Sequence, residues 1–192
     1  FRGCIRSLKI NKNAQVVKNN NNVVYSNIGQ CFQNVEEGAY FGGDAFAIYS
    51  KCRYRFNFPF AFTHNLWFVT EYTFKVNKFL ELSFEFKTGE PNGILLSVSN
   101  LGNSPALSVE LQNGAVVMTI DMGNGIISQV TNSPHSDSSL ADNEWHNITA
   151  LYSSSELTVN VDGVRKSWVQ SDITSMVDAI EAPLYVGGLP ST

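Results

Sequence analysis

The sequence predicts an all-β protein built as an antiparallel β-sandwich, and three observations lead there. Apolar and polar residues alternate over short segments, which is the pattern of strands with one buried face. Turn signals rich in Gly, Asn, Asp and Pro separate these segments every eight to twelve residues or so. No stretch shows the 3.6-residue spacing of an amphipathic helix. Charged residues make up only 16% of the chain, which fits two large sheets stacked face to face.

Each strand is predicted from its own pattern. Residues 80–87 alternate strictly, and the turn-forming residues 88–93 separate them from the apolar run 94–99. Asn113-Gly114 and Asp162-Gly163 each stand between two strand-like segments and predict tight hairpins. Residues 132–143 are polar and without period, which predicts a loop. The remaining expected strands are residues 107–111, 115–121, 126–131, 145–152, 157–161, 164–169 and 184–186.

The N-terminal end has a different character. Residues 1–10 form a strand-like run, and residues 11–22, rich in Asn and Lys, predict a solvated surface loop. The chain begins with Phe and shows no signal peptide, so we expect a piece of a longer polypeptide.

Composition excludes several classes of protein. The 192 residues suffice for one large β domain or two small ones, and 43% of them are hydrophobic, which excludes a disordered chain. The net charge of −4 argues against a nucleic-acid reader with a large basic surface. Residues 56–69 form the longest apolar stretch, but it is too short and too interrupted to predict a transmembrane helix.

Three cysteines are present: Cys4, Cys31 and Cys52. None forms a CxxC motif or a Cys/His set at zinc spacing, so no structural metal site is predicted. Cys4 and Cys31 close a loop whose bridging would contribute roughly 3 kcal/mol in an oxidising compartment. For Cys52, three interpretations stay open: a buried thiol, a partner outside this chain, or membership of an insertion described below.

Catalytic patterns are sparse. Glu81 and Glu85 flank Ser83 on one strand face, and jelly-roll glycan hydrolases place a nucleophile and an acid at similar spacing. Those enzymes carry a carboxylate where Ser83 stands, and an outward polar strand face produces the same alternation without chemistry. No G-x-S-x-G elbow is present. The three histidines are not separated along the sequence as metal ligands are. His146 is expected in a strand, with its ring hydrogen-bonded.

Five segments, taken in order, resemble a known family. Phe1-Arg2-Gly3-Cys4-Ile5, followed by a cysteine about thirty residues on, resembles the end of a laminin G-like (LG) domain, and the next segments resemble the domain that follows it. The sequence FRGCIRSL and the short segment between the two domains look most like the C-terminal LG pair of a laminin α chain. The other matching segments are Gly38–Gly43, Phe84–Thr88 with Asn92–Leu96, Glu144–His146 with Val161–Gly163, and Leu184–Gly188.

The resemblance implies a jelly-roll-like, concanavalin-like sandwich of about fourteen strands. It implies that residues 1–32 are the C-terminal end of an upstream LG domain, with Cys4 and Cys31 as its disulfide. Residues 33–192 would be an LG domain lacking its last strand. Because the ends of such domains lie close together, residues 1–32 are alternatively a permuted final strand that docks on the second domain.

Residues 50–71 exceed the length that the family pattern implies. They are strongly aromatic and without a clean period, so as a loop they would expose many rings. Reverse translation permits an intron donor at Ser50-Lys51-Cys52 and an acceptor tract near Phe68–Glu71. A retained intron, a real insertion and a functional hydrophobic patch are the three hypotheses.

The resemblance also implies a function: a secreted, non-catalytic adhesion module of the extracellular matrix or basement membrane. Its implied partners are cell-surface receptors of the dystroglycan or integrin type, sulfated glycans such as heparan sulfate, and neighbouring LG domains. No nucleic acid is expected. The alternatives are a lectin-like or pentraxin-like carbohydrate-binding sandwich and, less well supported, a glycan hydrolase using Glu81 and Glu85.

Three sets of residues are candidates for binding or modification. Some LG domains hold Ca²⁺ at one rim, and Asn103 and Asp178 are the candidate ligands. A neutral Asn weakens such a site, and two ordinary polar loops are the favoured alternative. Arg165 and Lys166 are the candidate glycan contacts, with a solvated face as the alternative. Asn147 begins an N-glycosylation sequon and must point outward to be used.

Overall fold

The computed structural model describes residues 1–15, 17, 23–31, 39–49, 74–76, 79–99, 106–121, 126–132, 139–153, 156–169 and 180–189. Throughout this part the chain forms β-strands joined by turns and loops. None of its described segments is a helix long and apolar enough to cross a membrane.

Fifteen strands lie within the described residues. They are β1 (Gly3–Ile10), β2 (Asn13–Ala14), β3 (Val23–Gln30), β4 (Ala39–Tyr49), β5 (Phe74–Val76), β6 (Phe79–Lys87), β7 (Gly93–Val98), β8 (Ala106–Gln112), β9 (Ala115–Asp121), β10 (Ile126–Asn132), β11 (His146–Ser153), β12 (Glu156–Val161), β13 (Val164–Val169), β14 (Ile180–Ala182) and β15 (Leu184–Val186).

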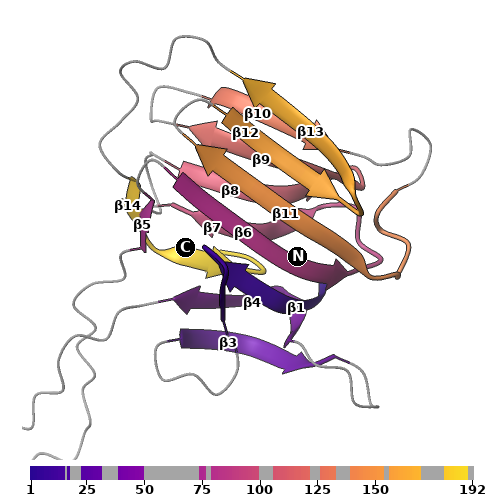
Figure 1. Ribbon diagram of the computed structural model, residues 1–192. Helices are drawn as coiled ribbons and strands as arrows, with labels where there is room; N and C mark the ends of the chain where they lie inside the picture. The colour runs from indigo at the N-terminus through magenta and orange to yellow at the C-terminus, as the bar shows by residue number, and fades with distance from the viewer. Residues whose placement is uncertain are drawn as a thin grey trace, which may run out of the picture.

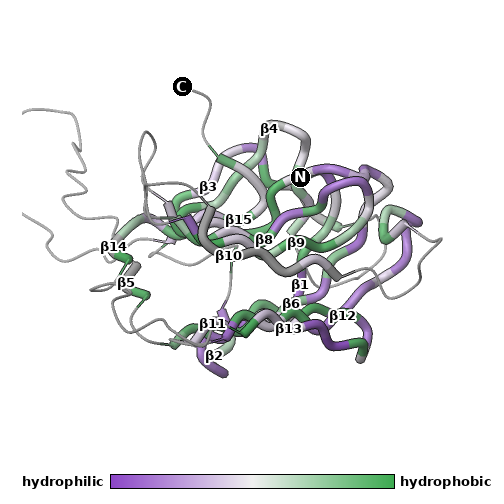
Figure 2. Tube along the Cα trace, turned by 90° about the horizontal axis from the view of Figure 1, so that it is seen from above, coloured by the Kyte–Doolittle hydropathy of each residue, from purple (hydrophilic) through white to green (hydrophobic). Residues whose placement is uncertain are grey.

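The strands form one curled antiparallel sheet that closes on itself as a sandwich. Its order is β10-β9-β8-β7-β15-β4-β1-β6-β11-β12-β13, with β2 added to β1 and β3 added to β4. The two ends of this path face each other, because β10 contacts both β12 and β13 across the core. Figure 1 shows the sheet, and Figure 2 shows its two layers from above. A separate small ribbon pairs β14 with β5.

Strand β1 joins the two layers. On one side, Gly3 to Ile5 pair with residues 39–41 of β4, and on the other side β1 pairs with residues 82–87 of β6. The sheet path therefore runs from β15 and β4 through β1 into β6. The expected strand at residues 1–10 is confirmed, and it lies in the middle of the sheet.

A bulge adapts β1 to this position. Arg6 faces Glu85 and Lys9 faces Ser83, so the β1 segment holds one more residue than the β6 segment opposite it. Ser7 has a φ of 54°, in the left-handed region, and absorbs the extra residue. The bulge changes the phase of the alternation, so that Ile5 before it and Leu8 after it are both buried.

The core between the layers is apolar and tightly filled. Phe41, Phe84 and Phe86 have no exposed surface, and Ile5 and Leu8 of β1 belong to the same cluster. The Phe1 ring lies 6.3 Å, centroid to centroid, from the rings of both Phe41 and Phe86. At Gly3 a side chain would collide with the backbone of Lys87, so this close approach needs a glycine.

Three two-residue hairpins have both central residues at positive φ, which is the type I′ geometry. Two of them use the expected pairs, Asn113-Gly114 (52° and 77°) and Asp162-Gly163 (50° and 86°). The third joins β1 to β2 through Asn11 and Lys12, with φ values of 47° and 68°. It places lysine where the other two turns have glycine.

The predicted all-β antiparallel sandwich is confirmed, and each expected strand of residues 80–186 is present within one or two residues. The sequence did not predict β3, which adds to the edge of β4, or the β5–β14 ribbon. Residues 50–71 lie outside the described part, so the three hypotheses about them stay open.

The position of β1 predicts a large cost for trimming its core side chains. We expect Ile5→Ala to lower the free energy of unfolding by about 2–5 kcal/mol, because it leaves a cavity between the layers. Lys9→Ala on the exposed side of the same strand serves as the control and should change stability by less than about 0.5 kcal/mol. Urea unfolding measures both values, and equal costs for the two variants would contradict the central placement of β1.

Candidate functional site

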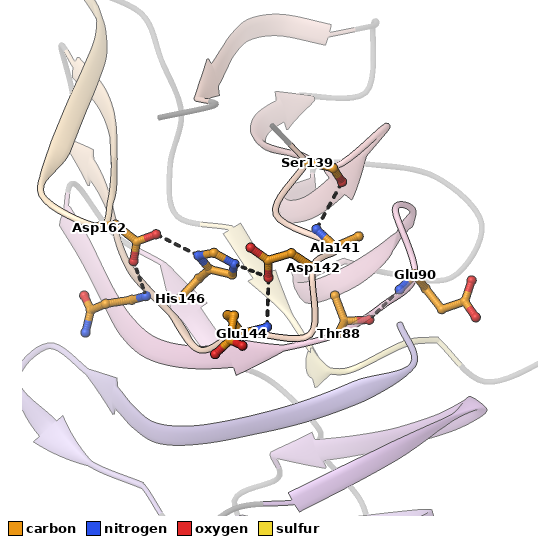
Figure 3. Close-up of polar contacts among 9 residues, drawn as sticks. Thr88, Glu90, Ser139, Ala141, Asp142, Glu144, His146 and Asp162 are labelled. Atoms are coloured by element: carbon orange, nitrogen blue, oxygen red, sulfur yellow. Dashed lines mark hydrogen bonds and ion pairs between the residues drawn. The ribbon is translucent and has the colours of Figure 1, made fainter. Parts of the chain in front are cut away.

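One end of the sandwich carries a polar network that links three segments of the described chain. The turn after β6, the loop of residues 139–145 and the β12–β13 turn meet there around His146, the first residue of β11 (Figure 3). His146 is 8% exposed, and its ring lies 5.4 Å from the ring of Phe86 in the core. An ionisable side chain thus sits where the apolar core meets the rim.

Both ring nitrogens of His146 face carboxylate oxygens. Nδ1 lies 2.7 Å from Oδ2 of Asp162, and Nε2 lies 3.0 Å from Oδ1 of Asp142. A neutral imidazole has one N–H and can satisfy only one of these acceptors, whereas an imidazolium donates to both. The geometry therefore favours the charged ring.

The pKa values agree with this geometry. Burial by itself lowers the pKa of His146, but the hydrogen bonds and charges of Asp162 and Asp142 outweigh it and hold the pKa above the usual 6.5. For Asp142, burial raises the pKa, while the Glu144 N–H and the His146 ring together bring it below its usual value. The ring has no free nitrogen for proton transfer to a substrate, so its role is structural.

The two aspartates also fix the backbone around the ring. Asp162 accepts the Asn147 N–H through Oδ1 at 2.8 Å, and Asp142 accepts the Glu144 N–H at 2.8 Å. Further hydrogen bonds tie the 139–145 loop to its neighbours, from Asn143 N–H to the Thr88 carbonyl at 2.9 Å and from Leu140 N–H to Gly114. The loops of this rim are consequently held in one arrangement.

The outer face of the β1–β6 pair carries a second cluster. The Arg6 guanidinium places Nε and Nη2 each 2.7 Å from Oε2 of Glu85, directly across the strand pair. The same guanidinium lies 3.9 Å from the centroid of the Trp145 ring, in a cation–π contact. Arg6 thus connects β1 to β6 and to the loop that carries Trp145.

The structure does not bring Glu81 and Glu85 together as a catalytic pair. Glu85 is held by Arg6, and Glu81 lies 4.0 Å from Lys12. A depression of about 270 Å³ on this face is lined by Glu81 and Ser83 with two lysines, and Glu85 is not among its described lining residues. Glu81 and Glu85 thus share the outward face of β6, and each lies beside a cation from β1 or from the turn after it.

The two candidate glycan contacts lie next to each other on β13 but on opposite faces of that strand. Arg165 pairs with Asn160, and its Nη2 donates to Glu156 at 2.7 Å, which partly neutralises its charge. Glu156 accepts from Thr158, Arg165 and Ser167, and these hydrogen bonds hold its pKa below the usual value. Lys166 is exposed and pairs with Val159. An anion reaches both cations only at the edge of β13.

Asn147 lies on the outer face of β11 and is exposed, while Thr149 two residues on lies on the same face. The outward orientation that the sequon requires is therefore present.

Cys4 and Cys31 are both buried, at 1% exposure each, in β1 and just after β3. Asn103, Asp178 and Cys52 lie outside the described residues, which themselves contain no group of three or more metal-ligating side chains.

Sequence reasoning found His146 but not its partners. The prediction of a strand residue with a hydrogen-bonded ring is confirmed. Asp162 was identified only as a turn residue, because its second role depends on β11 and β12 lying side by side. The pattern Asp-x-x-x-His at 142–146 was the one local signal for Asp142, and it is too common to identify a contact by itself.

Comparisons with known proteins identify the family. The sequence model described as "Laminin G domain" matches residues 86–192, more than half of the chain. The chain belongs to the laminin G domain family. This confirms the resemblance on which the sequence analysis relied.

Individual relatives support the same family. Human laminin subunit alpha-1 is 27% identical over 164 residues, and mouse laminin subunit alpha-1 is 28% identical over 190 residues, covering 85% and 98% of this chain. The chain spans about 5% of the length of each subunit. A solved structure titled "Mouse laminin alpha1 chain, domains LG4-5" has 29% sequence identity and a TM-score of 0.53, over 64% of this chain and 31% of that one.

The His146 network of this laminin G sandwich predicts a pH-dependent stability. Because the folded-state pKa of His146 is raised above 6.5, its contribution is fully present below that value and is lost as pH rises through the folded-state pKa. Because the pKa of Asp142 is lowered, its contribution is present above 3.8 and is lost on acidification. We expect NMR titration of the ring to give a pKa above 6.5.

Two isosteric variants separate the cause from a general charge effect. Asp142→Asn should lower the measured pKa of His146, because it removes one of the two carboxylates that face the ring. Glu144→Gln should leave it nearly unchanged, because the Glu144 contact to this network is through its backbone N–H. A ring pKa that responds equally to both variants would contradict the assigned network.

Proposed function

We propose that this chain is a non-catalytic adhesion module of the extracellular matrix that binds cell-surface receptors or glycans. Membership of the laminin G family carries the proposal, and the relatives are laminin subunits. The proposed partners are receptors of the dystroglycan or integrin type, heparan sulfate and neighbouring LG domains. Secretion into the matrix follows as part of the same proposal.

The architecture supports display rather than catalysis. A sandwich with a filled core presents its turns and edges in fixed positions, as binding proteins require. Both nitrogens of His146 are engaged by carboxylates, and Glu81 and Glu85 each lie beside a cation.

Lys166 is our candidate for the main glycan contact. It is exposed at the edge of the sheet, whereas neighbouring Arg165 already has Glu156 as its partner. A sulfated glycan that lies along the edge of β13 would meet Lys166 directly. It would have to compete with Glu156 for Arg165.

Salt elution from a heparin column tests this assignment. We expect Lys166→Ala to elute at lower salt than the parent chain, because a phosphate or sulfate contact contributes through counterion release. Glu156→Gln should elute later, because it frees Arg165 for the glycan. Unchanged elution of Lys166→Ala, together with normal folding, would contradict this site while leaving receptor binding by other surfaces open.

The same column tests the proposed calcium site. If Asn103 and Asp178 bind Ca²⁺ and the ion takes part in glycan binding, elution should differ between buffers with Ca²⁺ and with a chelator. Asp178→Ala should abolish that difference. Identical elution in both buffers would show that calcium has no part in this interaction.

We further propose that Asn147 carries an N-glycan when the chain is secreted. Its exposed position and the Thr149 two residues on support this. Mass spectrometry of chain secreted from animal cells should show a glycan whose mass is lost in Asn147→Gln. Thr149→Ser keeps the sequon and is the matched control. An unmodified Asn147 peptide in the secreted parent would refute this proposal.

A further inference from the structure

The N-glycan proposed at Asn147 would be attached to the face of a sheet and not to a loop. Asn147 points outward from β11, and this strand pairs with β6 on one side and with β12 on the other (Figure 1). Strand β6 in turn pairs with β1. The attachment therefore holds the first sugars directly above the outer face of these strands.

On the rim side of Asn147 this face is already filled. Glu85 lies directly opposite Asn147 and forms the ion pair with Arg6. The Arg6 guanidinium also stacks on the ring of Trp145, two residues before Asn147. These three side chains are engaged with one another, which directs a glycan toward the other side of Asn147.

That other side presents polar groups that a sugar can bind. Thr149, Ser83 and Lys9 lie in one line across β11, β6 and β1, because Thr149 pairs with Ser83 and Ser83 pairs with Lys9. The two hydroxyl side chains are half-buried, and Lys9 is exposed. Within the described part of the chain, neither hydroxyl has a hydrogen-bond partner and Lys9 has no ion-pair partner. Such groups can exchange their bound water for the hydroxyls of a sugar.

The line ends in the depression of about 270 Å³ described above. Ser83 and Lys9 line this depression together with Lys12 and Glu81. A strand spacing of about 4.8 Å places β1 about 10 Å across the sheet from β11, a distance that the first few sugars of an N-glycan can span. The lining offers two ammonium donors, a carboxylate acceptor and a hydroxyl, which together complement the hydroxyls of a sugar.

The character of this surface fits an uncharged sugar. Glu81 offsets the charge of one of the two lysines, so the depression does not favour a strongly anionic chain. Leu151, half-buried on the outer face of β11 and directly opposite Glu81, adds an apolar contact. A sugar ring has an apolar C–H face and a polar edge, and it can pack on the leucine while its hydroxyls reach the polar groups.

We propose that the Asn147 glycan folds back over β11 and β6 and that its sugars fill the depression beside Lys9. This inference rests on the N-glycosylation proposed above. Attachment makes the binding intramolecular, and a short flexible tether gives an effective concentration of about a millimolar, so a weak contact is enough to keep the glycan docked. The outer face of β1, β6 and β11 is then closed to receptors, which bind at the rims and at the β13 edge.

Lysine acetylation, read by peptide mass spectrometry, tests the docking. The chain secreted from animal cells is compared with the same chain after enzymatic removal of its N-glycan. We expect the glycan to slow the labelling of Lys9 at least about threefold, because a tethered sugar covers the ammonium group most of the time. Lys166, which points to the other face of its sheet, should be labelled at the same rate in both forms.

The outcomes separate docking from glycosylation. If the Asn147 peptide carries a glycan and Lys9 is labelled equally fast with and without it, docking is overturned and the glycosylation proposal stands. If the Asn147 peptide carries no glycan, both proposals fail.

A variant pair distinguishes a docked glycan from one that only moves freely above the sheet. Ser83→Gln places a larger side chain on the path between Thr149 and Lys9 and leaves the sequon intact, so it should remove at least about half of the Lys9 protection by steric conflict. Ser167→Gln makes the same change on β13, outside the path, and should keep the protection. Lys9 protection that is the same in both variants would overturn the proposal, because it would come from an undocked glycan.

Discussion

The two layers of this sandwich are hydrogen-bonded to each other through one strand. Because the sheet path runs β15-β4-β1-β6, only β1 connects the half that contains β7 to β10 with the half that contains β11 to β13 among the described strands. Its N-terminal end also contacts both layers at once, since the Phe1 ring packs against Phe41 of β4 and Phe86 of β6. The alignment of the layers, and hence the shape of the rims, depends on this strand.

The His146 network fixes the position of the rim relative to the core. Phe86 packs against both Phe1 and His146, so the core cluster and the polar network share one aromatic ring. Asp162, in the β12–β13 turn, bonds both the His146 ring and the Asn147 N–H, and so holds that turn against the start of β11. A charged imidazolium with two carboxylates is stable there because each buried N–H has an acceptor, which offsets the cost of removing the ring from water.

Features that depend on residues close together in the sequence were predictable, and features that depend on distant segments were not. Strands such as residues 80–87 and hairpins at Asn113-Gly114 follow from local alternation and from the need for positive φ, so they were predictable. The central position of β1 is different, because nothing within residues 1–10 says which strands lie beside them. The family resemblance suggested a docked final strand. The bulge at Ser7 appears only when the register with β6 is known, and the positive-φ turn at Lys12 only when β1 is known to pair with β2.

The candidate site was less predictable than the fold for the same reason. Arg6, Glu85 and Trp145 come from three separate segments, and each alone is an ordinary surface residue in the sequence. The adjacent residues Arg165 and Lys166 appear as one basic pair in the sequence, yet a strand directs them to opposite faces and Glu156 engages one of them. On a strand, two cations adjacent in sequence therefore point away from each other, and one partner can reach both only at the strand edge.

The distribution of charge decides where a polyanion can approach the described part of the molecule. The rim around His146 carries Asp142, Glu144 and Asp162, with Glu90 on the turn after β6 (Figure 3), and the cations beside these carboxylates are His146 and Arg2. Further exposed cations lie on the edge of β13 and on the outer side of β1. The carboxylates of this rim outnumber its cations, which fits the proposed glycan contact at Lys166 on a strand edge.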